Sequence, residues 1–150
     1  MEIQKWMKNP VHSVKLLDSI QHARDIMETH RVNQLAVVAG GRLIGIITDR
    51  DLRAAFPSVF DSSVLGSRKP RTFATDPKAV TVEMVMTTNV LTLTPRDSMV
   101  DAARLMRRER IGAIPDVEGN RLVGILTRSD VLDAFVALAR SIAPEQHGSR

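Results

Sequence analysis

Apolar positions in the first third of the chain follow two different periods. From residue 20 to about residue 30 they recur every three or four positions, which predicts a helix with one buried face behind a cap at Asp18. Residues 35–39 and 42–47 are instead rich in β-branched side chains. The Gly40-Gly41 pair between them tolerates positive φ, so these two runs predict a β-hairpin.

The second half of the chain repeats this pattern at a fixed offset of 79 residues, without a gap between residues 7–52 and 86–131. In the first copy an extended segment at residues 10–14 precedes the helix, and a second helix at 49–56 ends at Pro57. The second copy predicts a strand at 89–94, a cap at Asp97, a helix to about Arg110, strands at 114–117 and 121–126, and a helix at 128–140.

This internal duplication predicts an α/β (α+β) fold of two β-α-β-β-α repeats, packed around a pseudo-two-fold axis with related clefts between them. We expect repeat 1 at residues 1–56, a linker at 57–79, repeat 2 at 80–140 and a flexible tail at 141–150. Residues 81–86 mirror residues 1–7 as a lead-in to their repeat. Function is therefore expected between the repeats.

Composition removes several kinds of chemistry. The 150 residues include no cysteine, so disulfides, thiolate metal sites and cysteine nucleophiles are excluded. The four histidines have no metal-ligand spacing, and we expect them to be structural or on the surface. The apolar runs are too short to span a bilayer and no signal peptide is recognisable, so a cytoplasmic protein without a membrane partner is expected.

The net charge of +4 favours acidic partners. Basic residues gather in the linker and on one predicted helix: Arg68, Lys69 and Arg71, and Arg104, Arg107, Arg108 and Arg110. Solvated surface is the favoured interpretation, and attraction for a phosphorylated ligand or a nucleic acid is the alternative. An aromatic content of 3% argues against a platform for stacking single-stranded bases.

A Gly-x-x-Thr-x-x-Asp motif occurs twice, at residues 45–51 and 124–130. In both places a strand runs directly into a helix, whose first backbone N–H groups can receive an anion. The aspartate suits a vicinal pair of hydroxyls, as on a ribose. The same residues also match a capping box, which is the favoured interpretation of one copy alone, and the duplication does not decide between them.

The complete pattern resembles a tandem pair of CBS domains, the cystathionine-β-synthase-type module. The resemblance lies in the lead-ins at residues 6–14 and 85–93, the hairpins and the two Thr-x-x-Asp motifs, and it covers about residues 1–140. With residues 132–138 included, the chain is most similar to stand-alone CBS proteins of the acetoin-utilisation type.

The resemblance implies an adenosine-containing ligand: AMP, ADP, ATP or S-adenosylmethionine. It implies a first cleft formed by Thr48, Arg50, Asp51, Thr92, Gly112, Ala113, Ile114 and Pro115. It implies a second cleft formed by Ser13, Asn33, Gln34, Ala36, Thr127, Arg128, Ser129 and Asp130. It also implies a homodimer that pairs through its helices. The apolar residues of 131–139 are a candidate contact surface, and burial in the core is an equal alternative for them.

We favour the first cleft, because Gly112-Ala113 admits a purine close to the backbone and Pro115 offers it a flat apolar face. Ala36 replaces that proline in the second cleft. Asp116 is expected to face water or an arginine, since an unpaired buried carboxylate is costly. Asp49 beside Thr48 would repel a polyphosphate, which favours AMP.

The predicted function is regulatory and non-catalytic, an energy-sensing module in which a bound nucleotide shifts the relative positions of the repeats. The sequence contains no nucleophile beside a histidine, no metal-ligand cluster and no phosphate-cradling loop, so an enzyme and a catalytic cofactor are not expected. The alternative is a nucleic-acid-binding or purely structural module that uses the basic surface. The sequence does not identify the protein that would be regulated.

Overall fold

The computed structural model describes residues 1–56 and 76–143. Two copies of one element order follow each other along the chain, and the predicted helices at 49–56 and 128–140 agree with the structure to within two residues. The first copy contains β1 (Ser13–Val14), α1 (Ile20–His30), β2 (Gln34–Ala39), β3 (Arg42–Thr48) and α2 (Asp49–Ala55). The second contains α4 (Met99–Glu109), β4 (Ala113–Glu118), β5 (Arg121–Thr127) and α5 (Arg128–Ile142). Short 3-10 helices precede them at Ile3–Lys5 and Val82–Met84.

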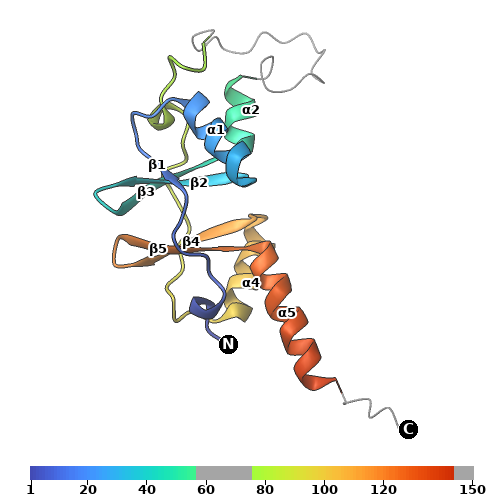
Figure 1. Cartoon of the computed structure of the whole chain (residues 1–150). Helices are drawn as coiled ribbons and strands as arrows, with labels where there is room; N and C mark the ends of the chain where they lie inside the picture. The colour runs from blue at the N-terminus through green and yellow to red at the C-terminus, as the bar shows by residue number, and fades with distance from the viewer. Residues whose placement is uncertain (57–75, 144–150) are drawn as a thin grey trace.

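The strands form one five-stranded sheet in the order β1-β2-β3-β5-β4. Each hairpin is antiparallel, and the two hairpins meet at the pair Arg42 and Arg121. Figure 1 shows the hairpins facing each other in the middle of the molecule, with α1 and α2 on one side and α4 and α5 on the other. The predicted architecture of two packed repeats is confirmed.

Each repeat has its own hydrophobic core, and each core is completed by the lead-in of the other repeat. Ile3 is buried in the core of the second repeat, where its N–H donates to the Asp97 carbonyl at 3.0 Å. Val82 is buried in the core of the first repeat, where its N–H donates to the Asp18 carbonyl at 2.8 Å. Complete burial of such a side chain contributes about 2 kcal/mol. This exchange holds the repeats together and places residues of each lead-in beside the other repeat.

The predicted caps at Asp18 and Asp97 are wrong by one residue. The Ser19 hydroxyl accepts from His22 N at the start of α1, and the Ser98 hydroxyl accepts from Val100 N and Asp101 N at the start of α4. Asp18 instead accepts from Lys15 N at 2.8 Å, and Asp97 accepts from Thr94 N at 2.8 Å. The aspartate therefore closes the turn before the helix, which leaves the following serine to cap it.

The strand predicted at residues 89–94 is also wrong, since only Leu93 forms an isolated bridge, to Asp116. In the first repeat the equivalent segment forms β1, in which Ser13 pairs with Ala36. Pro115 stands at the position equivalent to Ala36 and has no N–H to donate. The loss of this donor explains why the ladder is shorter in the second repeat. The predicted linker at 57–79 and tail at 141–150 lie mostly outside the described residues.

Candidate functional site

A cleft of about 400 Å³ lies between the two repeats, at the start of α2 and the start of β4. Six residues predicted for the first cleft line it: Thr48, Arg50, Asp51, Gly112, Ala113 and Pro115. The first three come from repeat 1 and the last three from repeat 2. The structure therefore brings the two halves of the predicted set together.

Two predicted members of the first cleft do not line it. Ile114 is fully buried in the core of repeat 2, because alternate residues of β4 point to opposite faces and Ala113 and Pro115 take the cleft side. Thr92 lines a separate hollow with Leu43 and Gly119. Asn33 and Gln34, predicted for the second cleft, also line this one, as do Asp49 and Arg110, which the sequence analysis considered near a phosphate. Sequence reasoning missed further lining residues, which are Ile46, Arg53, Thr87, Asn89, Val90, Leu91 and Ile111. Only their position in the folded chain identifies them.

Thr48 and Asp51 form the capping box that the sequence left open. Asp51 Oδ2 accepts from Thr48 N at 2.9 Å, and Thr48 Oγ1 accepts from Asp51 N at 3.1 Å. The cap uses only one carboxylate oxygen. Within the described ranges, 1–56 and 76–143, Asp51 Oδ1 has no hydrogen-bond or ion-pair partner. Capping therefore leaves one acceptor of Asp51 available at the cleft.

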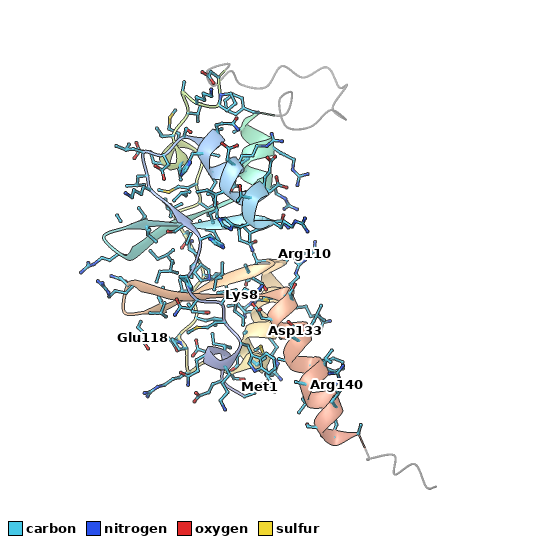
Figure 2. All side chains as sticks on the ribbon, viewed as in Figure 1. Met1, Lys8, Arg110, Glu118, Asp133 and Arg140 are labelled. Carbon is cyan, nitrogen blue, oxygen red and sulfur yellow. The ribbon has the colours of Figure 1, made fainter. Side chains whose placement is uncertain are left out.

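The cleft also contains three arginines and two aspartates. Arg53 Nη2 lies 2.5 Å from Asp49 Oδ2, so the charge of Asp49 is largely compensated. This pair weakens the repulsion of phosphate that the sequence predicted for Asp49. Arg50 and Arg110 have no acidic partner among the residues that the structure describes. Figure 2 places Arg110 at the end of α4 that faces the first repeat, and both guanidiniums suit a phosphate.

The residues predicted for the second cleft are not gathered in the same way. Asn33 and Gln34 line the first cleft, and Ala36 is fully buried. Ser13 lines a hollow beside Pro10, whereas Arg128 lines a groove between α4 and α5. Thr127, Ser129 and Asp130 lie at the start of α5 and line neither of these hollows.

The Thr127 and Asp130 pair repeats the capping box, with further bonds. Asp130 Oδ2 accepts from Thr127 N at 2.7 Å and from Thr127 Oγ1 at 2.8 Å. Asp130 Oδ1 lies 3.6 Å from Lys8 Nζ. Asp130 is only 4% exposed, and each of its carboxylate oxygens has a partner.

The prediction that Asp116 faces water or an arginine is wrong. Asp116 is fully buried, and neither carboxylate oxygen has a hydrogen-bond partner among the described residues. The pKa of Asp116 is raised from 3.8 to about 7, mainly by burial and in addition by the negative charges of Asp130 and Asp97. The equivalent residue of repeat 1 is Val37, also fully buried, so Asp116 occupies a core position.

Most of the apolar side chains of α5 lie on the surface. Val131 packs against the core, whereas Leu132, Phe135, Val136 and Leu138 are exposed. Figure 1 shows α5 extending away from the rest of the molecule. The predicted contact surface is thus available on this chain, although part of the helix belongs to the core.

The basic residues that the sequence analysis singled out lie on the surface or outside the described residues. Arg104, Arg107, Arg108 and Arg110 are exposed, and Arg68, Lys69 and Arg71 lie outside the described residues. No three His, Asp or Glu side chains of residues 1–56 and 76–143 are placed to hold a metal ion. Within the same ranges, no helix combines the length and apolar character needed to cross a membrane.

Comparison with known proteins agrees with this architecture. The sequence profile of the CBS domain matches residues 2–58 and 82–137, so the chain belongs to the CBS-domain family. A CBS domain-containing protein of Dictyostelium discoideum is 31% identical over 146 residues, which cover 95% of this chain and 97% of that protein. The resemblance found in the sequence is confirmed.

Three solved structures share the fold at 26% sequence identity. A Vibrio cholerae protein assigned as the acetoin utilization protein AcuB has a TM-score of 0.75 and covers 93% of both chains. CBSX2, solved in complex with AMP, also has a TM-score of 0.75 and covers 93% of this chain and 98% of its own. The CBS domain pair of protein MJ0100, solved with 5-methylthioadenosine and S-adenosyl-L-methionine, has a TM-score of 0.72 and covers 92% of this chain and 98% of its own.

Proposed function

We propose that this chain is a regulatory, non-catalytic module that binds an adenosine-containing nucleotide in the first cleft, with AMP as the favoured ligand. ADP, ATP and S-adenosylmethionine are the alternatives. The observation that carries the proposal is the available Oδ1 atom of Asp51, which shares the cleft with Gly112 and Pro115 of the other repeat. The adenosyl ligands of the CBSX2 and MJ0100 structures support the same class of ligand.

The lining residues suggest how each part of a nucleotide is held. Pro115 provides an apolar face for the adenine ring, and Gly112 and Ala113 let the ring approach the backbone. Asp51 Oδ1 accepts hydrogen bonds from the ribose hydroxyls. Arg50 and Arg110 bind the phosphate, since both line the cleft, and at the start of α2 the N–H groups of Asp49 and Asp51 already donate to Asn33 O and Thr48 Oγ1.

A ligand held in this way contacts both repeats at once. The ligand therefore favours the arrangement of the two repeats to which it binds more tightly. The size of this shift is set by the difference between its affinities for the two arrangements. In a cell this change in the arrangement of the repeats would transmit the concentration of an adenine nucleotide to a regulated protein. A cytoplasmic location stays a prediction from the sequence.

We further propose a homodimer that buries the exposed side of α5. The side chains of Leu132, Phe135 and Ile142 are 63%, 66% and 74% exposed, which is unusual for large apolar residues on one helix. Replacement of Phe135 by aspartate should convert a dimer into a monomer in light scattering. A wild-type chain that is monomeric at high concentration would contradict this part of the proposal.

Nucleotide binding can be tested by thermal unfolding and calorimetry with AMP, ADP, ATP and S-adenosylmethionine. Ligand at a hundred times its Kd should stabilise the chain by about 2.7 kcal/mol, which raises Tm by about 5 to 10 °C. An unchanged Tm at millimolar concentrations of all four ligands would contradict the proposal.

Two matched variants separate binding from capping. Asp51→Asn and Asp130→Asn each weaken an equivalent capping box by about 1 kcal/mol. Only Asp51→Asn should also reduce AMP affinity, by about tenfold or more. A larger loss of AMP affinity in Asp130→Asn than in Asp51→Asn would show that the nucleotide binds at the second cleft.

A second candidate function, nucleic-acid binding, is favoured by the groove between α4 and α5. Arg107, Arg110 and Arg128 line this groove of about 350 Å³, and they have no acidic partner among residues 1–56 and 76–143. Three phosphate contacts would give a slope of about −3 when the logarithm of affinity for duplex DNA is plotted against that of salt concentration. Weak binding without this slope would exclude the candidate.

A further inference from the structure

Lys8 and Thr87 occupy equivalent places in the two repeats. Lys8 N donates to Ile125 O at 2.9 Å and Lys8 O accepts from Ile125 N at 3.1 Å. Thr87 forms the same pair of bonds with Ile46, at 2.9 and 3.0 Å. The two backbones are thus held alike, and the side chain is what differs at this position.

The residues before them fix these positions equally firmly. A Cβ atom built on Gly124 would lie 2.6 Å from Met7 Sδ, and one built on Gly45 would lie 2.8 Å from Met86 Sδ. Each methionine therefore packs directly against a glycine of the other repeat. This contact leaves residues 8 and 87 little freedom to move away from the strands beside them.

The consequences for the two aspartates are opposite. Thr87 lines the first cleft, and Asp51 Oδ1 has no partner among the described residues. At the start of α5 the Lys8 ammonium lies 3.6 Å from Asp130 Oδ1, and the side chain of Asp130 is only 5% exposed. Figure 2 shows Lys8 against the strands of the second repeat. The atom of Asp130 that corresponds to the available oxygen of Asp51 is therefore occupied by a cation.

We propose that Lys8 prevents a nucleotide from binding at Asp130, the residue equivalent to Asp51, so that each chain binds one nucleotide and not two. This rests on the proposed function, because it assigns the vacant carboxylate oxygen of Asp51 to the ribose. A ribose at the second cleft would have to replace a charged partner of a buried carboxylate with neutral hydroxyls.

Calorimetric titration of the full chain with AMP provides the test. Wild type should bind one equivalent, Lys8→Thr should bind two, and Lys8→Arg should stay at one because it keeps the cation. Thr87→Lys should lower the affinity of the first cleft by about tenfold or more, because it places an ammonium beside Asp51. Lys8 is 61% exposed, so these variants should fold, which unfolding without ligand will verify.

Each result bears on the proposal. Two equivalents in wild type, or one equivalent in Lys8→Thr, would overturn it. Tighter AMP binding by Thr87→Lys would also overturn it, since a lysine at this position would then act as a phosphate ligand. An absence of AMP binding in every variant would instead contradict the proposed function, on which this proposal depends.

Discussion

At the first cleft Thr87 leaves one oxygen of Asp51 without a partner among the described residues, whereas at the second cleft Lys8 lies beside the corresponding oxygen of Asp130. Both aspartates close the same capping box at the start of a helix. A duplicated backbone can therefore keep its helix caps in both copies while the side chains around them diverge. Such divergence is expected when fold and binding depend on different atoms of one residue.

The largest expected effect concerns the two cores, in which Asp116 stands where repeat 1 has Val37. Asp116→Val should raise the free energy of unfolding above pH 7 by about 4 kcal/mol, since it removes a carboxylate that burial makes costly to ionise. Val37→Asp should lower it by a similar amount. Denaturant unfolding of both variants checks this, with the exposed Asp101→Asn as a control that should change little.

The buried Asp116 also predicts how the free energy of unfolding changes with pH. The pKa of Asp116 is about 7 when folded and near 3.8 when unfolded, so the unfolded state releases this proton at lower pH. Stability should fall as pH rises from about 4 to about 7, and this contribution should vanish in Asp116→Val. Equal pH profiles for wild type and variant would contradict the burial of this carboxylate.

The next effect compares Phe56 with Phe135, which are equivalent under the 79-residue offset. Phe56 is 6% exposed in the core of repeat 1, and Phe135 is 66% exposed on α5. Phe56→Ala should lower the free energy of unfolding by about 3 kcal/mol. Phe135→Ala should cost the monomer less than about 1 kcal/mol. Unfolding at several protein concentrations separates these costs from any loss of dimer contacts.

A smaller effect is expected at the wall of the first cleft. Pro115→Ala should reduce AMP affinity by about threefold to tenfold, because the apolar face is lost and the backbone becomes more flexible. Ala36→Val, at the equivalent position of the other repeat, should not change AMP affinity. If calorimetry gave the same loss of AMP affinity for both variants, Pro115 and Ala36 would contribute equally to binding.

The smallest expected difference is between the two serine caps. Ser19→Ala and Ser98→Ala each remove an acceptor for the first N–H groups of α1 or α4, and each should cost about 1 kcal/mol. Unequal costs would show that the repeats differ in stability as well as in binding. Thermal unfolding of the two variants measures this directly.

The position of the cleft was largely predictable, because the motif residues recur at one offset and a strand places them beside a helix start. Thr48 and Asp51 follow from that pattern, and Gly112 and Pro115 follow from the resemblance to CBS pairs. Ile114 was assigned to the cleft wrongly because the motif was applied as a continuous run, whereas β4 presents only alternate residues to it. Lys8 and Thr87 are far along the chain from the motifs that they adjoin in the folded protein, so sequence reasoning did not find them.

The sequence by itself determined the duplication, most of the order of the elements and the hairpins, since these depend on the local pattern of residues. It left open whether the Thr-x-x-Asp motifs are capping boxes, which the structure decided. The tertiary structure decided that each lead-in packs on the other repeat, which brings Lys8 to Asp130 and Thr87 to the cleft of Asp51. It also decided that Asp116 is buried without a partner among the described residues. These outcomes depend on contacts between distant segments, which appear only when the chain has packed.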